Sequence, residues 1–132
     1  MFGDVKSKTN CPSSPLILPS NLVFSDEFAT DGAPDPTKWG YDLGAGGWGN
    51  GELQTYTNSP TNAVVQGGNL VITAVRNGNS YTSARLKSEN KFEFRYGKVE
   101  FRAKLPAGAG TWPALWMLGQ NYATNTCKKQ KI

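Results

Sequence analysis

The stretch NLVITAVRNGNSYTSARL, residues 69–86, decides the fold class. A run of β-branched and apolar residues over 70–75 precedes Asn77-Gly78, a dipeptide that strongly favours a tight hairpin turn. Residues 82–86 then resume the alternation of side chains that a strand requires. We therefore predict a β-hairpin in this stretch.

Arg85 has a distinctive position on the return strand of this hairpin. Side chains alternate between the two faces of a strand, so Arg85 points away from Ala84 and Leu86. Its guanidinium is thereby left free for a ligand or for water.

Strand patterns occur in other parts of the chain as well, at 22–28, 52–57, 92–105 and 113–118. Within 92–105 the parity of the apolar positions flips at Gly97, which indicates a bulge or a turn. About seven strands with turn residues between them, and no helical period, predict an all-β fold: an antiparallel β-sandwich or jelly roll.

The composition fits one small globular domain with polar ends. Hydrophobic residues make up 38% of the 132 residues and charged ones 18%. A disordered lead-in is predicted over 1–20, and a polar tail without strand pattern over 120–132. Residues 21–120 hold nine basic and nine acidic side chains, so the net charge of +4 comes from the ends. This balance argues against nucleic acid as a partner.

Several kinds of chemistry are excluded by residue counts. The chain has no histidine, which rules out Ser-His-Asp catalysis and histidine metal sites. Cys11 and Cys127 could form at most one disulfide, and the sequence leaves their pairing open. The apolar run 16–18 is too short for a signal peptide or a membrane span, so no export signal and no membrane partner are expected.

Aromatic and polar residues gather in two places. Trp112 and Trp116 have the same strand parity, so both indoles could line one ligand-binding face or could belong to the core. The loop GAGGWGNG, residues 44–51, is too rich in glycine for a regular strand, and it places Asn50 and Glu52 near an indole.

Taken together, seven segments resemble glycoside hydrolase family 16, close to its laminarinases, which are endo-β-1,3-glucanases. The segments are SDEF (25–28), KWGYD (38–42), GGWGNGELQTYT (46–57), GGNLVITA (67–74), YTSARLKS (81–88), YGKVEFRAKLP (96–106) and TWPALWMLG (111–119). The resemblance implies a curved, concanavalin A-like jelly roll. Residues 21–119 would form its N-terminal, incomplete part.

The resemblance also implies the partner and the residues that bind it. Sugar contacts are implied for Asn50, Glu52, Arg85, Trp112 and Trp116. The expected ligand is β-1,3-glucan, met in an extracellular or periplasmic setting. No cofactor is expected for catalysis. Some relatives hold a structural calcium near the positions of Glu27 and Gly68, together with an aspartate that this sequence lacks.

Catalytic carboxylates are not expected in this chain. The resemblance implies a motif E-x-D-x-x-E after the tryptophan strand, with its first glutamate as nucleophile and its last as acid/base. NYATNTCKKQKI stands there instead, and no acidic residue follows Glu100. The lysine-rich ending indicates a truncated or frame-shifted gene product.

The acids that are present do not form a predicted catalytic pair. Asp26 and Glu27 are adjacent and point to opposite faces of their segment. Glu89 and Glu93 share a predicted face with two basic residues, as in a solvated charge ladder. A retaining pair needs two carboxyl groups about 5.5 Å apart.

Three functions remain open at this point. The chain could be an inactive part of a retaining endo-β-1,3-glucanase, a non-catalytic β-glucan-binding protein, or a structural β-domain without a sugar role. In each case we expect Leu115 and Met117 to lack covering strands, which would favour aggregation.

Overall fold

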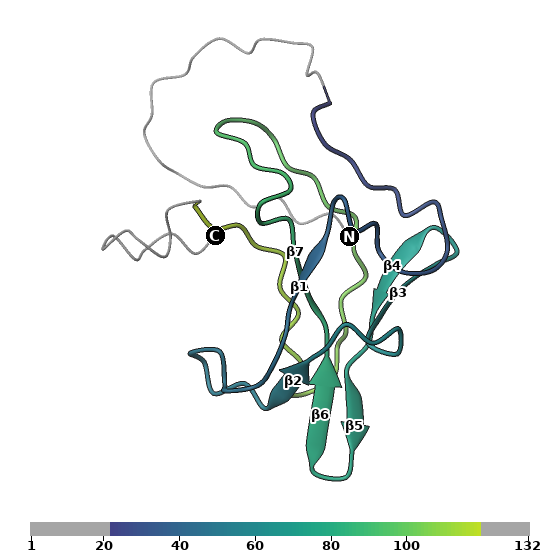
Figure 1. Cartoon of the computed structure of the whole chain (residues 1–132). Helices are drawn as coiled ribbons and strands as arrows, with labels where there is room; N and C mark the ends of the chain where they lie inside the picture. Colours follow the sequence, from purple (N-terminus) through teal and green to yellow (C-terminus); the bar gives the residue numbers. More distant parts are fainter. Residues whose placement is uncertain (1–21, 120–132) are drawn as a thin grey trace.

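The computed structural model describes residues 22–119, and this part consists of short strands and loops (Figure 1). The strands are β1 (Gly40–Asp42), β2 (Gln54–Tyr56), β3 (Ala63–Gln66), β4 (Asn69–Ile72), β5 (Val75–Asn77), β6 (Ser80–Ser83) and β7 (Arg85–Lys87). The predicted lead-in 1–20, the tail 120–132 and both cysteines lie outside the described residues. Within 22–119 there is no helix long and apolar enough to cross a bilayer.

The strands pair into three small sheets. The hairpin β3–β4 forms one, β1 with β7 forms a second, and β2–β6–β5 forms a third. Most pairs are antiparallel, as predicted, but β2 runs parallel to β6. Parallel pairing requires a long crossover connection, which the intervening β3, β4 and β5 supply here (Figure 1).

The predicted hairpin turn is confirmed, but its first strand is divided. Asn77 pairs with Ser80 across the turn between β5 and β6. Residues 69–72, however, pair backward with β3 through a second tight turn at Gly67-Gly68, where φ is +57° and +72°. Both turns carry the glycine that a positive φ favours, so the sequence of 70–75 alone could not decide which neighbour each half would choose.

The predicted return strand is also divided, at Ala84. β6 ends at Ser83 and pairs with β5 and β2, whereas β7 begins at Arg85 and pairs with β1. Ala84 itself is buried, at 7% exposure. One continuous segment therefore serves two sheets and places Arg85 where they meet.

A buried asparagine ties the sheets together. Asn62 is 1% exposed and precedes the buried Ala63 of β3. Its Oδ1 accepts a hydrogen bond from the Thr57 hydroxyl at 2.6 Å. Its Nδ2 donates to the carbonyl of Thr73 at 3.0 Å and to the hydroxyl of Thr82 at 3.1 Å. The side chain thus joins the ends of β2 and β4 to β6. Its burial is tolerated because both the amide oxygen and the amide nitrogen have hydrogen-bond partners.

The prediction of a strand at 22–28 was wrong. This segment is held by aromatic contacts instead of a ladder: Phe24 stacks on Phe92 with ring centroids 4.5 Å apart, and Phe28 stacks on Trp39 at 6.3 Å. The indole nitrogen of Trp39 donates to Asp26 at 2.7 Å. Apolar alternation there reflects ring packing, which resembles a strand pattern in sequence.

The predicted strands at 92–105 and 113–118 are likewise absent, and we call residues 93–119 the arm. Every residue of the arm is exposed, including Leu115 at 51% and Met117 at 40%. A strand needs a neighbouring strand for its backbone hydrogen bonds, and none of the strand pairs within residues 22–119 includes a residue of the arm. The expected lack of covering strands over these two side chains is therefore observed.

Candidate functional site

Arg85 and Asp42 form an ion pair at the meeting point of the sheets. The register of β1 and β7 sets Asp42 directly opposite Arg85. The arginine Nε lies 2.9 Å from Oδ2 of Asp42, and Lys87 places its Nζ 2.7 Å from Oδ1 of the same carboxylate. Hydrogen bonds to Asp42 and then to Glu89 raise the pKa of Lys87. One carboxylate is thus shared by two cations on one face of β7.

Three aromatic rings surround the Arg85 guanidinium. Its Cζ lies 4.8 Å from the ring centroid of Trp48, 4.7 Å from that of Trp116 and 5.9 Å from that of Tyr56. The rings of Trp48 and Tyr56 meet edge to face at 5.5 Å. Such distances are those of cation–π contacts, which hold a guanidinium flat against an indole.

Glu52 lies beside this group as an ionised acceptor. It accepts hydrogen bonds from the Tyr56 hydroxyl at 2.7 Å, from Gln54 at 2.8 Å and from Asn50 at 3.0 Å. The Tyr56 bond is the main cause that lowers the pKa of Glu52, and the charge of Arg85 acts in the same direction. Burial, with the bond to Glu52, raises the pKa of Tyr56.

The glycine-rich loop shapes the approach to Glu52. The amide N–H groups of Asn50 and Glu52 both donate to the carbonyl of Gly47, at 2.8 and 3.1 Å. Gly47 has φ of +75°, and a Cβ there would lie 3.4 Å from the backbone of Gly51. The loop folds back on itself because glycine permits this conformation and this close approach.

The structure brings together most of the residues predicted to bind sugar. Arg85 contacts Trp116, and Asn50 contacts Glu52. Trp112 is 71% exposed and Trp116 42%, so the alternative that both belong to the core is wrong. Trp112 makes no contact with the Arg85 group within the described residues.

Sequence reasoning assigned no sugar contact to four members of this group, although it noted Trp48 and Gln54 beside Asn50 and Glu52. They are Asp42, Trp48, Gln54 and Tyr56. Tyr56 could have been found, because it shares the parity of Glu52 and Gln54 along one strand. Asp42 carries no such signal, since its pairing with Arg85 depends on the register of strands far apart in the sequence.

The acids at 89 and 93 do not lie on a strand. Residues 88–91 form a turn in which the N–H of Lys91 donates to the carbonyl of Ser88, and Asn90 has φ of +60°. Glu89 pairs with Lys87 at 2.6 Å. The predicted ladder over these acids was therefore wrong.

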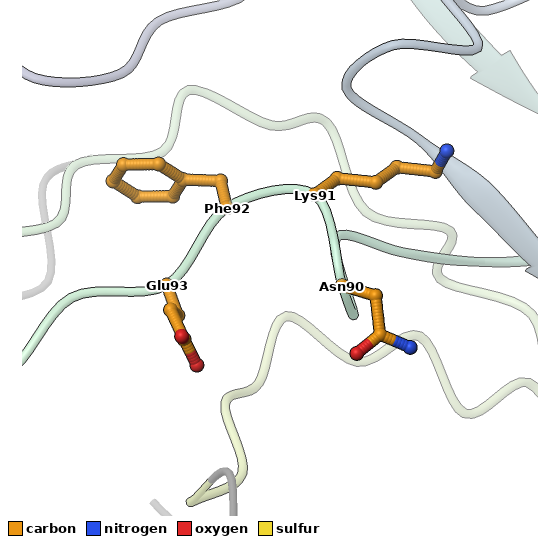
Figure 2. A pocket seen from close by; sticks show the side chains of 4 residues that line it. All are labelled: Asn90, Lys91, Phe92 and Glu93. Carbon is orange, nitrogen blue, oxygen red and sulfur yellow. The ribbon is translucent and has the colours of Figure 1, made fainter.

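A surface depression of about 250 Å³ lies over the same turn (Figure 2). Its lining residues are Asn90, Lys91, Phe92 and Glu93. Figure 2 shows their side chains diverging from the backbone rather than converging. Lys91 donates to the carbonyl of Pro36 at 2.6 Å, and the Phe92 ring stacks on Phe24 and Phe94. These groups are already engaged in holding the turn, so the depression has no converging donor set.

The residues implied for calcium, Glu27 and Gly68, lie in two loops of the described region. Glu27 is exposed, and Gly68 lies in the β3–β4 turn. Residues 22–119 contain no group of three acidic or sulfur ligands that could hold a metal ion. Calcium also takes backbone carbonyl oxygens as ligands, so a site at Glu27 and Gly68 stays a prediction.

Comparison with known proteins gives a consistent result. A sequence profile of the glycosyl hydrolases family 16 matches residues 50–128. The "Beta-glucanase" of Rhodothermus marinus is 55% identical over 101 residues, covering 74% of this chain and 35% of that protein. The "Glucan endo-1,3-beta-glucosidase A1" of Niallia circulans is 41% identical over 133 residues, covering 87% and 19%.

A solved structure agrees with both. The laminarinase from Flavobacterium sp. UMI-01 superposes with a TM-score of 0.73 at 47% identity, over 79% of this chain and 46% of that one. The chain therefore spans less than half the length of each of these relatives. Because the profile covers more than half of this chain and the superposition covers 79% of it, the chain belongs to glycosyl hydrolases family 16 and has its all-β jelly-roll fold.

Proposed function

We propose that the group around Arg85 binds β-1,3-glucan, as part of a retaining endo-β-1,3-glucanase domain whose catalytic carboxylates are not among the residues of this sequence. The observation that carries the proposal is the Arg85 guanidinium, set within 5 Å of the centroids of two indoles and next to an ionised Glu52.

The chemistry of a glucan suits this arrangement. A glucose ring presents C–H groups on its faces and hydroxyls on its rim. The exposed indole of Trp116 offers an apolar surface for such a face. Glu52 can accept from a hydroxyl, and the terminal nitrogens of Arg85 can donate to one. The family relatives whose names specify β-1,3-glucan support this choice of ligand.

The acids near Arg85 are unsuited to acid/base catalysis. A retaining glycosidase needs one carboxyl group that stays protonated, which requires a raised pKa. The pKa of Glu52 is instead lowered by its hydrogen bonds. Asp42 is engaged by two cations, at 2.9 and 2.7 Å. We therefore expect binding without turnover from this chain.

Affinity electrophoresis in gels containing laminarin tests the binding. The chain is expected to be retarded, and Arg85→Met is expected to migrate freely. Arg76→Met is the matched control, because Arg76 also lies over a ring, that of Tyr81, but on the exposed strand β5. Equal retardation of both variants would contradict the assignment. Release of reducing ends from laminarin by the purified chain would contradict the absence of catalysis.

A second candidate is a non-catalytic β-glucan-binding protein. It is favoured by the same two observations, the lowered pKa of Glu52 and the contacts of Asp42 with two cations. Both candidates predict binding without turnover. Reading the DNA downstream of the coding sequence in all three frames separates them. An E-x-D-x-x-E motif there would favour the enzyme, and its absence would favour the binding protein. Either function is expected outside the cytoplasm, where a polymeric glucan is met.

A further inference from the structure

Asp42 and Arg85 form an ion pair that is largely buried and whose hydrogen-bond geometry is poor. Both side chains are largely buried, with 17% of Asp42 and 21% of Arg85 exposed. The Nε atom of Arg85 is buried and makes no well-aligned hydrogen bond within the described residues, although Oδ2 of Asp42 is 2.9 Å away. Asp42 therefore acts on the guanidinium chiefly through its charge, and that attraction is little weakened by solvent.

The neighbouring cation makes this charge necessary. Lys87 lies two residues along β7, on the same face as Arg85. Like charges in these positions repel each other, and the carboxylate of Asp42 contacts both. Without Asp42, the long arginine side chain would be driven away from Lys87 and off the indoles.

Asp42 also determines which nitrogens of Arg85 remain available. The Asp42 carboxylate lies 2.9 Å from Nε, and the two terminal nitrogens have no protein acceptor in the part of the chain that is described. A guanidinium carries five N–H donors in a fixed plane, so a charge that attracts its Nε edge limits where the other donors can lie.

We propose that Asp42 is a positioning residue, whose carboxylate holds the Arg85 guanidinium against Trp48 and Trp116 so that its terminal nitrogens face a sugar hydroxyl. This inference rests on the proposed function for its ligand, but the placement of Arg85 can be measured without a ligand.

The test compares two substitutions that remove one negative charge beside Lys87. Asp42→Asn removes the carboxylate that contacts both Lys87 and Arg85. Glu89→Gln removes the carboxylate that contacts Lys87 at 2.6 Å and leaves the Asp42 pair with Arg85 in place. Binding of laminarihexaose is measured by calorimetry. We expect a Kd about tenfold higher for Asp42→Asn, as for loss of one charge-assisted contact, and a change within about twofold for Glu89→Gln.

A second readout follows the indole N–H signals in ¹⁵N NMR spectra without ligand. The chain has four tryptophans, whose signals are assigned with Trp→Phe variants. Those of Trp48 and Trp116 are expected to shift in Asp42→Asn and to stay in place in Glu89→Gln. Asp42→Glu keeps the charge on a longer side chain, so it should give an intermediate shift and recover part of the affinity. It also carries the test if Asp42→Asn does not fold.

The outcomes separate the positioning role of Asp42 from the proposed binding of glucan. Unchanged signals of Trp48 and Trp116 in both Asp42 variants would overturn the positioning role, whatever the binding data. Normal binding by Asp42→Asn together with loss of binding by Arg85→Met would overturn it too, while leaving the proposed function intact. Shifted signals in Asp42→Asn, together with a parent chain that does not bind laminarihexaose, would support the positioning role and overturn the proposed function.

Discussion

Replacement of Asn62 by alanine should destabilise the fold more than any surface change. The substitution removes three side-chain hydrogen bonds from a residue that is 1% exposed, those with Thr57, Thr73 and Thr82. Each such bond contributes about 1 kcal/mol net, and the partners left behind stay buried. We therefore expect the free energy of unfolding to fall by about 3 kcal/mol.

Urea unfolding followed by circular dichroism measures this change. Asn58→Ala is the matched control, since Asn58 is exposed and should change the free energy by no more than about 0.5 kcal/mol. Thr82→Val removes one of the three bonds and should cost about 1 kcal/mol. Sulfate in the buffer strengthens burial and keeps the Asn62→Ala transition measurable.

The reasoning on Asn62 fails if its alanine variant unfolds at the same urea concentration as Asn58→Ala. It also fails if Thr82→Val costs as much as Asn62→Ala, because the three bonds would then not contribute separately.

Three further predictions concern the site and the arm. Hydrogen bonds lower the pKa of Glu52 below its ordinary value of 4.5, so the contribution of Glu52 to laminarin binding is complete above pH 4.5 and is lost as the pH falls through the lowered pKa. A pH series of gel retardation should show this loss, and Glu52→Gln should lack it. Trp116→Ala should weaken gel retardation more than Trp112→Ala, because Trp116 contacts Arg85, and equal losses would contradict this ranking. The parent chain should self-associate in size-exclusion chromatography, and Leu115→Lys with Met117→Lys should shift it toward monomer; a monomeric parent would refute the claim that the exposed arm drives association.

Local signals in the sequence predicted the parts of the fold that depend on neighbours in the chain. Asn77-Gly78 specified its turn because few dipeptides adopt the required conformation, and β2 fell within the predicted strand 52–57. The segments 22–28 and 92–105 were misjudged because alternation of apolar residues does not specify which part of the chain will pack against them. In one case aromatic rings provide the contacts, and in the other the described residues provide no neighbouring strand.

By itself the sequence determined the all-β class, the family resemblance and the list of sugar-binding candidates, since these depend on residue types and short spacings. Tertiary structure decided which of them meet. The shared role of Asp42 between Arg85 and Lys87 follows from the register of β1 against β7, and the position of Trp116 over Arg85 follows from the path of the arm. Contacts between residues distant in the chain are set by strand register and by the path of the backbone, and no local pattern encodes them.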